Sequence, residues 1–232
     1  MALVIFLAYF VRGISGFGSA LVAVPLLVQV MPITVVVPTI VLLDYTASMS
    51  HGIRHFNHIQ WRDLIPMLPF TLAGILIALF LLKQLQPGLL TDALGTFIVL
   101  YALYSLLPLP PLHGSRLWAA PLGLLTGLVG TVFGTGGPFT VIYLGLRDLG
   151  KSAFRGTVAT FFAIDGGLRL AGFTMSGFYH FENLLLALMA LPILATALYA
   201  GGHIHTNLSR AALVRIIAFI LIGSGGALLM KS

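Results

Sequence analysis

The sequence predicts an all-α polytopic membrane protein with two inverted repeats, each a glycine-broken re-entrant helical hairpin plus three transmembrane helices. Hydrophobic residues make up 59% of the 232-residue chain and charged residues only 8%, which leaves too little polar surface for a soluble domain. Long apolar runs recur along the chain, and glycines interrupt two of them at corresponding places in the two halves. Paired interruptions of this kind are typical of membrane carriers.

The first repeat begins with an interrupted apolar segment. Its first 31 or so residues are nearly all apolar and would form a helix about 46 Å long if unbroken. Because the hydrocarbon core of a bilayer is only about 30 Å thick, we expect a break at residues 13–18. Gly16 and Gly18 can leave helical geometry at little cost there. Three spans should follow, at about 32–50, 64–82 and 89–107.

The second interrupted segment covers residues 117–146. Two apolar runs flank a glycine-rich turn, and Pro138 suits the first turn of a new helix because it lacks an N–H group. Three further spans are expected at about 156–176, 184–200 and 213–230. Residues 108–116 then link a first repeat, residues 1–107, to a second repeat, residues 117–232.

A shift of about 118 residues superimposes the two halves of the chain. Each repeat contains three full spans and a hairpin, which is an odd number of crossings, so we expect the second half to be inverted relative to the first. The shift places one set of candidate residues on another in order: Gly16, Gly18, Ser19 and Thr39 fall on Gly134, Gly136, Gly137 and Thr157.

The distribution of basic residues predicts the topology. If both interrupted segments are hairpins, the loops at 51–63, 108–116, 147–155 and 203–210 share one face, which then holds seven of the twelve lysines and arginines, against Lys83 and Lys231 on the other face. The positive-inside rule places that face in the cytoplasm and both termini outside it. We therefore expect a multi-pass protein of the inner or plasma membrane.

Composition excludes several other classes of protein. The net charge of +6 is dispersed through short loops, which fits membrane topology better than a nucleic-acid partner. The absence of cysteine excludes disulfides and thiolate metal sites. His51, His55 and His58 have helical spacing, but the polar residues around them indicate a surface loop rather than a metal site. We expect no metal, no cofactor and no enzymatic activity.

The two interruptions predict an anion site. Two half-helix N-termini from inverted halves would meet near the midplane of the bilayer, each with free N–H groups and a partial positive charge. The alternatives are close helix packing for the glycines and a bond to the same helix for each hydroxyl. The predicted substrate-binding residues are Ser15, Gly16, Gly18, Ser19, Thr39, Gly134, Thr135, Gly136, Gly137 and Thr157.

Ionisable residues inside spans are candidate functional groups because a charge at membrane depth is costly. Asp165 and Arg169 are four residues apart on one predicted helix, so they can form an ion pair that is either structural or part of substrate or proton transfer. Asp44 has no partner within its own segment, and we expect it to carry a coupled proton. Arg12 lies near a segment end and is expected to reach the membrane interface.

At these motifs the chain resembles the TauE/SafE family of sulfite and organosulfonate exporters. The resemblance rests on G-x-G-S-A-L-V-A-V-P-L-L at Gly16–Leu27, G-T-G-G-P-F-T-V-I-Y-L at Gly134–Leu144 and R-G-T at Arg155–Thr157. It implies a carrier that exports small sulfur-containing oxyanions, such as sulfite, thiosulfate or small sulfonates, by alternating access coupled to the proton gradient. Departures from the family pattern are Ser19, Ala20 and Tyr143.

Two other classes of function remain as alternatives. An anion channel or a carboxylate carrier would also place broken helices around an ion. An intramembrane serine protease would use Ser15, which lies in a G-x-S-G pattern at residues 13–16. Such a protease needs a buried histidine to activate its serine, and every histidine here falls in or beside a loop. The class also leaves the second glycine motif unexplained.

Overall fold

The predicted all-helical class is confirmed. The computed structural model describes every residue except 17, 53–58, 108–113, 204–209 and 232, and every element within that part of the chain is a helix. Four helices are long and apolar enough to cross a bilayer, judged by length and composition. They are Trp61–Gln84, Pro87–Leu106, Arg116–Phe133 and Phe181–His203. Shorter apolar stretches cover Ala2–Ile14, Ile33–Met49 and Ile217–Met230.

The first predicted interruption is confirmed. Helix α1, Ala2–Ser15, ends where Gly16 adopts a left-handed φ of 84° and donates its N–H to the carbonyl of Arg12 at 2.7 Å. Helix α2, Ser19–Leu27, begins after Gly18, whose φ is 93°. Only glycine adopts such angles without strain, so these two positions fix the end of one helix and the start of the next. Nine residues of α2 rise only about 14 Å.

The second predicted interruption is confirmed in the same form. Helix α7, Ala119–Phe133, ends at Gly134 with a φ of 73°. Helix α8, Gly137–Gly145, starts two residues after Thr135 and carries Pro138 in its first turn. The two helices of each interrupted segment pack against one another, α1 on α2 and α7 on α8. Each segment is therefore a helical hairpin.

Every predicted span is present as a helix, with small differences at the ends. The largest difference is at α9, which begins at Lys151 rather than near residue 156, so half of the predicted basic loop is the first turn of a helix. The remaining elements are α3 Ile33–Gly52, α4 Trp61–Leu64, η2 Ile65–Met67, α5 Leu68–Gln84, α6 Pro87–Leu106, η3 Arg116–Trp118, α9 Lys151–Met175, α10 Phe181–His203 and α11 Arg210–Lys231.

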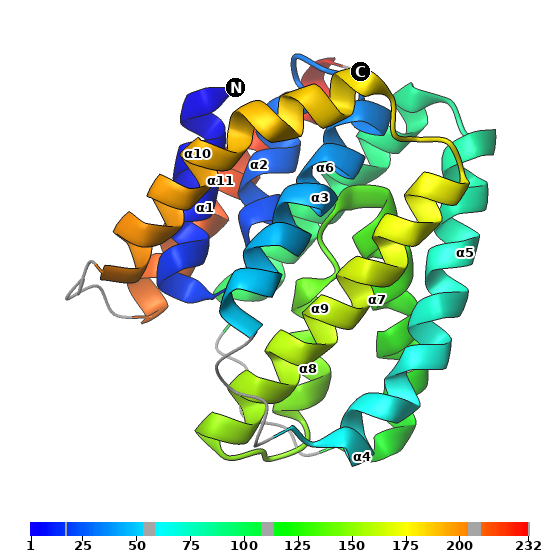
Figure 1. Cartoon of the computed structure of the whole chain (residues 1–232), viewed down its shortest axis with the longest axis vertical. Coiled ribbons are helices and arrows are strands. Elements are labelled where there is room, and N and C mark those ends of the chain that lie inside the picture. Colours follow the sequence, from blue (N-terminus) through cyan, green and yellow to red (C-terminus); the bar gives the residue numbers. More distant parts are fainter. Residues whose placement is uncertain (17, 53–58, 108–113, 204–209, 232) are drawn as a thin grey trace.

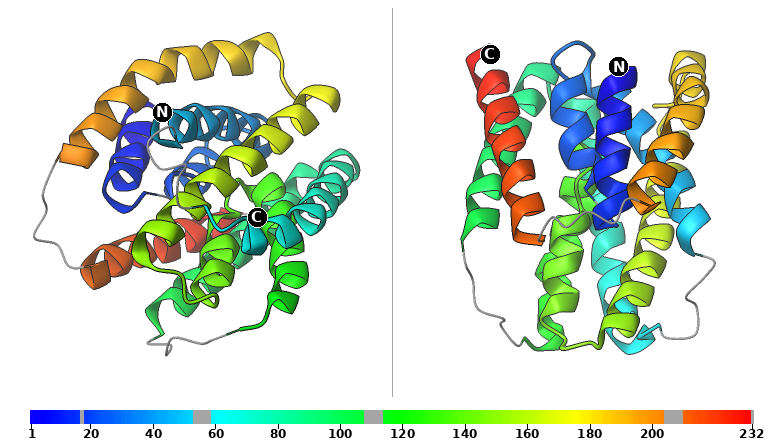
Figure 2. Two further views of the ribbon diagram at one scale, coloured as in Figure 1. Left: turned by 60° about the horizontal axis from the view of Figure 1, so that its bottom comes forward. Right: turned by 90° about the vertical axis from the view of Figure 1, so that its left-hand side faces the viewer.

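The two hairpins occupy opposite ends of the molecule. In Figure 1 and in the right panel of Figure 2, α1 and α2 lie toward the end that holds both termini, and α7 and α8 lie toward the end that holds α4. The start of α9 also lies at the α4 end. Helix α10 stops short of that level in both figures, and residues 204–209 of the predicted fourth basic loop lie outside the described part of the chain.

A buried carboxylate ties the segments at the α4 end together. Asp63 lies on α4 and is 5% exposed. One of its oxygens accepts a bond of 2.9 Å from Nε of Arg116 on η3 and a bond of 3.0 Å from Nε of Arg147, just beyond α8. The network joins the start of α7 to the end of α8, so it holds the open end of the second hairpin.

Close glycine contacts determine how the helices cross. Helix α5 packs on α7 where Gly74 faces Gly127, and α10 packs on α1 where Gly201 faces Gly13. Helix α6 packs on α11, and α3 packs on α9 between the two hairpins. At each glycine crossing a Cβ atom would meet the backbone of the partner helix. Small residues thus allow close backbone approach, as in other membrane helices.

Replacing Gly127 by alanine should destabilise the α5–α7 crossing. The added Cβ would overlap the carbonyl oxygen of Thr71, a backbone atom that cannot turn away. Overpacking of this kind costs on the order of 1–3 kcal/mol. The measurement is the thermal unfolding midpoint in detergent. Gly226→Ala on α11 is the matched control, because nothing lies within 4 Å of its Cβ position. Equal midpoints for the two variants would contradict the packing account.

Candidate functional site

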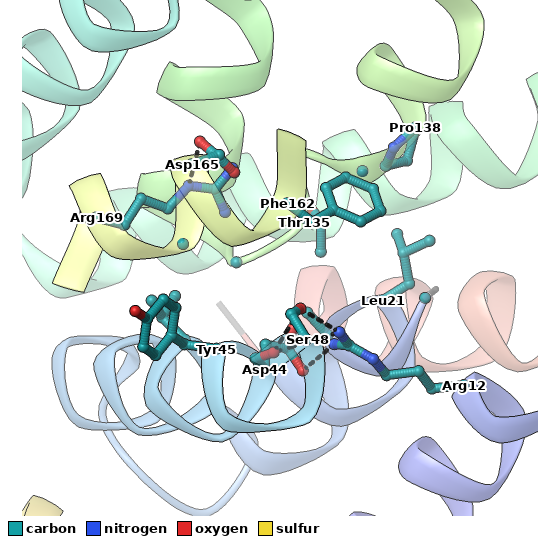
Figure 3. A pocket seen from close by; sticks show the side chains of 16 residues that line it. Arg12, Leu21, Asp44, Tyr45, Ser48, Thr135, Pro138, Phe162, Asp165 and Arg169 are labelled. Carbon is teal, nitrogen blue, oxygen red and sulfur yellow. Dashed lines mark hydrogen bonds and ion pairs between the residues drawn. The ribbon is translucent and has the colours of Figure 1, made fainter. Parts of the chain in front are cut away.

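A small cavity lined by both polar and apolar residues lies between the two helix interruptions. It encloses about 70 Å³, which is room for several waters or one small ligand, since a single water needs roughly 10–15 Å³. Figure 3 shows α9 on one side of it and α3 on the other. The lining residues are Arg12, Gly18, Ala20, Leu21, Val41, Asp44, Tyr45, Ser48, Gly134, Thr135, Gly137, Pro138, Phe162, Asp165, Gly166 and Arg169.

Both short helices begin at this cavity. Gly18 precedes α2, Gly137 opens α8, and both residues line the space. Within the described residues, no N-cap side chain accepts a hydrogen bond from the N–H groups at either helix start. The first turn of a helix carries N–H groups without intrahelical partners and a partial positive charge. The cavity is therefore bordered by two electropositive helix ends that come from different halves of the chain.

An ion pair between α1 and α3 borders one side of the cavity. Nη1 of Arg12 lies 2.7 Å from Oδ1 of Asp44. Nη2 of the same guanidinium donates to the hydroxyl of Ser48 at 2.7 Å and to the main-chain carbonyl of Asp44 at 3.3 Å. One sequence-based expectation is therefore wrong, because Arg12 bonds to α3 inside the protein and does not extend outward to a membrane interface. The charged partner of Asp44 lies on a different helix, which agrees with the expectation that its own helix supplies none.

Two hydroxyls reinforce the same carboxylate. Tyr9 and Ser19 each donate to Oδ1 of Asp44 at 2.7 Å. Ser19 also accepts a bond of 3.1 Å from Nη1 of Arg12. Because Ser19 is the first residue of α2, this network fixes the start of the short helix to α1 and α3. The hydroxyl of Ser19 is occupied by the protein, and the residue itself does not line the cavity.

The predicted ion pair on α9 is confirmed on the other side of the cavity. Nε of Arg169 donates to Oδ1 of Asp165 at 3.1 Å, and Nη2 contacts Oδ2 of the same carboxylate. The guanidinium also reaches α7, where Nη1 donates to the carbonyl of Gly130 at 3.0 Å and Nη2 to that of Thr126 at 3.3 Å. Both side chains are almost fully buried.

Glycines of the second motif make room for this arginine. A Cβ atom at Gly130 or at Gly136 would overlap the guanidinium of Arg169. Gly136 therefore packs against the arginine and does not line the cavity, whereas Gly134 and Gly137 do. In the first hairpin Gly18 lines the cavity but Gly16 is exposed outside it. Some glycines of the two motifs thus lie at helix starts beside the cavity, where they were predicted. Others leave space for the side chain of Arg169.

Thr135 is the hydroxyl best placed to meet a ligand. It lies in the break between α7 and α8, lines the cavity and is only 2% exposed. Its Oγ1 has no hydrogen-bond partner within the described part of the protein. Figure 3 shows its side chain pointing into the space between α9 and α3. A buried hydroxyl without a partner costs free energy, so a ligand or water that accepts its bond would be stabilising.

The structure does not bring the other predicted hydroxyls into the cavity. Thr39 donates to the carbonyl of Val35 on its own helix at 2.8 Å, which is the alternative raised for such residues. Thr157 accepts a bond of 2.9 Å from the main-chain N–H of Gln60. Neither residue belongs to the lining. The side chain of Ser15 lies outside the described part, although its backbone ends α1.

The histidine hypotheses fall largely outside the described part of the chain. His55 and His58 are not described, and neither is the side chain of His51. His203 stacks on Tyr199 and contacts its main-chain carbonyl. Within the described residues, no group of three or more histidine, cysteine, aspartate or glutamate side chains could hold a metal ion.

Comparison with known proteins agrees with this architecture. The family described as "Sulfite exporter TauE/SafE" matches residues 1–228. The "Probable inner membrane transporter protein TsaS" of Comamonas testosteroni is 28% identical over 197 residues, which is 80% of this chain and 79% of that protein. No solved structure matches the chain. The resemblance indicated by the two glycine motifs is confirmed, and so is the predicted multi-pass location in the inner membrane.

Replacing Gly130 by alanine should destabilise the protein because the methyl group displaces the guanidinium of Arg169. A double-mutant cycle isolates this cause. The thermal unfolding midpoint is measured for Gly130→Ala in the native background and in the neutral background Asp165→Asn/Arg169→Gln. We expect a clear loss of stability in the first and a much smaller loss in the second. An equal loss in both backgrounds would show that the glycine is needed for another reason.

Proposed function

Because the chain belongs to the TauE/SafE sulfite exporter family, we propose that it exports small sulfur-containing oxyanions, such as sulfite, thiosulfate or small sulfonates, across the inner membrane. Transport is coupled to the proton gradient. The observation that carries the proposal is the cavity where two helix starts and two arginines from different halves of the chain meet. Its small volume suits a compact anion.

The charge distribution of the cavity supports an anionic substrate. Arg12 and Arg169 supply two permanent positive charges, and the helix starts at Gly18 and Gly137 add partial ones. Asp44 and Asp165 neutralise the arginines while no substrate is bound. An oxyanion can accept hydrogen bonds from guanidinium groups, main-chain N–H groups and the free hydroxyl of Thr135 at the same time. We therefore place the substrate between the starts of α2 and α8.

The packing of the helices supports the inverted repeat. In the proposed repeat, α1 corresponds to α7 and α5 corresponds to α10. The contact between α5 and α7 then has its counterpart in the contact between α10 and α1. The pairs α3–α9 and α6–α11 each consist of two corresponding helices. Such swapped and self-paired contacts are expected if residues 1–107 and 117–232 are related by a two-fold axis in the membrane plane. Alternating access would then rock the two hairpin bundles around the cavity.

The positions of the basic residues support an orientation. Arg62, Arg116, Arg147, Lys151 and Arg155 belong to segments gathered at the α4 end of the molecule, whereas Lys83 lies in the last turn of α5. By the positive-inside rule the α4 end faces the cytoplasm. The second hairpin therefore enters from the cytoplasmic side and the first from the opposite side.

Purified protein in liposomes should carry sulfite or thiosulfate when a pH difference is imposed. Flux is measured for sulfite, thiosulfate, a small sulfonate and acetate, each with and without the pH difference. We expect the sulfur oxyanions to be carried and acetate to be carried poorly, with faster flux under the gradient. If acetate is carried as fast as the sulfur oxyanions, the protein is better described as a carboxylate carrier. If flux is independent of the pH difference and does not saturate with substrate concentration, a channel is favoured.

Replacing Thr135 by valine should weaken substrate binding without destabilising the fold, because its hydroxyl has no partner in the described part of the protein. Loss of one hydrogen bond to a ligand is worth about 0.5–1.5 kcal/mol, so we expect the KM for transport to rise roughly 2–10-fold. The matched control is Thr71→Val, because the hydroxyl of Thr71 bonds to the carbonyl of Met67 in η2 and the residue does not line the cavity. An unchanged KM in Thr135→Val would show that the hydroxyl of Thr135 does not bond to the substrate.

A further inference from the structure

The two ion pairs that border the cavity are held very differently. Oδ1 of Asp44 accepts bonds from three side chains, those of Tyr9, Ser19 and Arg12. Within the described residues Asp165 receives its hydrogen bonds from Arg169 alone. The two carboxylates, which lie on the corresponding helices α3 and α9, therefore depend on their arginines to different degrees.

The two carboxylates, Asp44 and Asp165, also differ in how deeply they are buried. The side chain of Asp44 is 24% exposed, so water in the cavity can solvate it, whereas that of Asp165 is only 4% exposed. If Arg12 turned away, Asp44 would keep two hydroxyl donors and some water. If Arg169 turned toward an anion, Asp165 would be left as a buried carboxylate with no donor. A buried, unpaired charge of that kind is too costly to persist and is removed by taking up a proton.

We propose that Asp165 takes up the coupled proton when a substrate anion binds to Arg169, while Asp44 stays ionised and holds Arg12 in place. This inference rests on the proposed transport function. The proton moves from water onto a carboxylate oxygen of Asp165, and the anion takes over the hydrogen bonds that the guanidinium gave to that carboxylate. The proton neutralises Asp165, and the anion supplies the negative charge that then pairs with Arg169. A monoanion leaves the net charge of the site unchanged, and a dianion such as thiosulfate adds one negative charge. Proton and anion cross in the same direction, so flux should be faster when the side from which the substrate leaves is the more acidic one.

The groups around Asp165 are compatible with this exchange. Across the cavity, α3 contributes Asp44 and Tyr45 and α1 contributes Arg12, and the paired Arg12 and Asp44 largely cancel in charge. On α7 the groups that touch Arg169 are the neutral carbonyls of Gly130 and Thr126.

The remaining charged or titratable groups on the helices that pack against α9 lie toward the ends of those helices. Lys83 is in the last turn of α5, and Arg62 and Asp63 are on α4. Asp63 bonds to Arg116 and Arg147 there, and Tyr143 of α8 belongs to the apolar cluster at the same end. Arg169 is therefore the dominant charged neighbour of Asp165.

This assignment replaces the sequence-based hypothesis that Asp44 carries the proton. That hypothesis rested on the absence of a partner within the same helix, and the structure gives Asp44 one charged partner and two hydroxyl donors from other helices. Two of these hydrogen bonds, those from Tyr9 and Ser19, do not depend on Arg12. Asp44 is accordingly a positioning residue that orients Arg12 and the start of α2.

Proton uptake on substrate binding tests the assignment. Thiosulfate is added to purified protein in weakly buffered detergent, and the pH change is recorded with an indicator dye. Native protein should take up about one proton per bound thiosulfate. Asp165→Asn should take up none, yet still bind thiosulfate, with an affinity that no longer depends on pH. Asp44→Asn should bind more weakly but keep the same proton uptake. Glu182→Gln, an exposed carboxylate on α10, serves as the matched control.

The outcomes separate this inference from the proposed function. If native protein neither binds nor transports thiosulfate or sulfite, the proposed function fails. If native protein takes up protons and Asp165→Asn does so equally, or if Asp44→Asn loses the uptake, the assignment to Asp165 is overturned. Should Asp165→Asn not fold, Asp165→Glu is measured instead. We expect that variant to keep proton uptake with a shifted pH dependence, and a dependence identical to that of native protein would overturn the inference.

Discussion

A helix that stops inside a membrane leaves backbone N–H and C=O groups that lipid cannot satisfy, and the rest of this structure follows from that constraint. Such an end is tolerated only where protein or a polar cavity surrounds it. The chain satisfies this twice, at Gly16–Gly18 and at Gly134–Gly136, and both breaks border the same space. Helix α3 packs on α9 between the hairpins, and these two helices flank the cavity that both breaks border (Figure 3). The polar space is a structural consequence of the interruptions as well as the proposed substrate site.

The same low-polarity surroundings determine how the charges are arranged. An arginine at this depth is costly without a carboxylate, and each half of the chain supplies one such pair. The pairs differ in their support, since Asp44 gains hydroxyls from Tyr9 and Ser19 and Asp165 gains none among the described residues. The two halves thus each hold one buried ion pair, and they hold it with unequal strength. In the proposed mechanism one pair can remain fixed while the other exchanges its partners.

Local signals in the sequence predicted most of the fold, because apolar runs, glycine and proline act within a few residues of their own position. The breaks before Ser19 and before Gly137 were predictable in this way. The partners of Arg12 were not, since Asp44 lies 32 residues away and the contact depends on how α1 crosses α3. An arginine within an otherwise apolar segment was nevertheless a signal that could have marked it as a site residue.

Gly130 and Gly136 illustrate a second limit of prediction from sequence. Glycine was predicted to break a helix or to expose N–H groups, and here it makes room for the side chain of a distant arginine. Thr39 and Thr157 correspond in sequence, but neither lines the cavity, because the hydroxyl of Thr39 bonds to its own helix and that of Thr157 to the main chain of Gln60.

The most direct test of the proposed anion site is a structure of the protein with selenite, a heavier analogue of sulfite whose selenium gives an anomalous signal. The account predicts one peak in the cavity between the starts of α2 and α8, within hydrogen-bonding reach of Thr135 and of Arg12 or Arg169. A structure without a peak in this cavity, or with peaks only beside Arg116 and Arg147 at the α4 end, would contradict it.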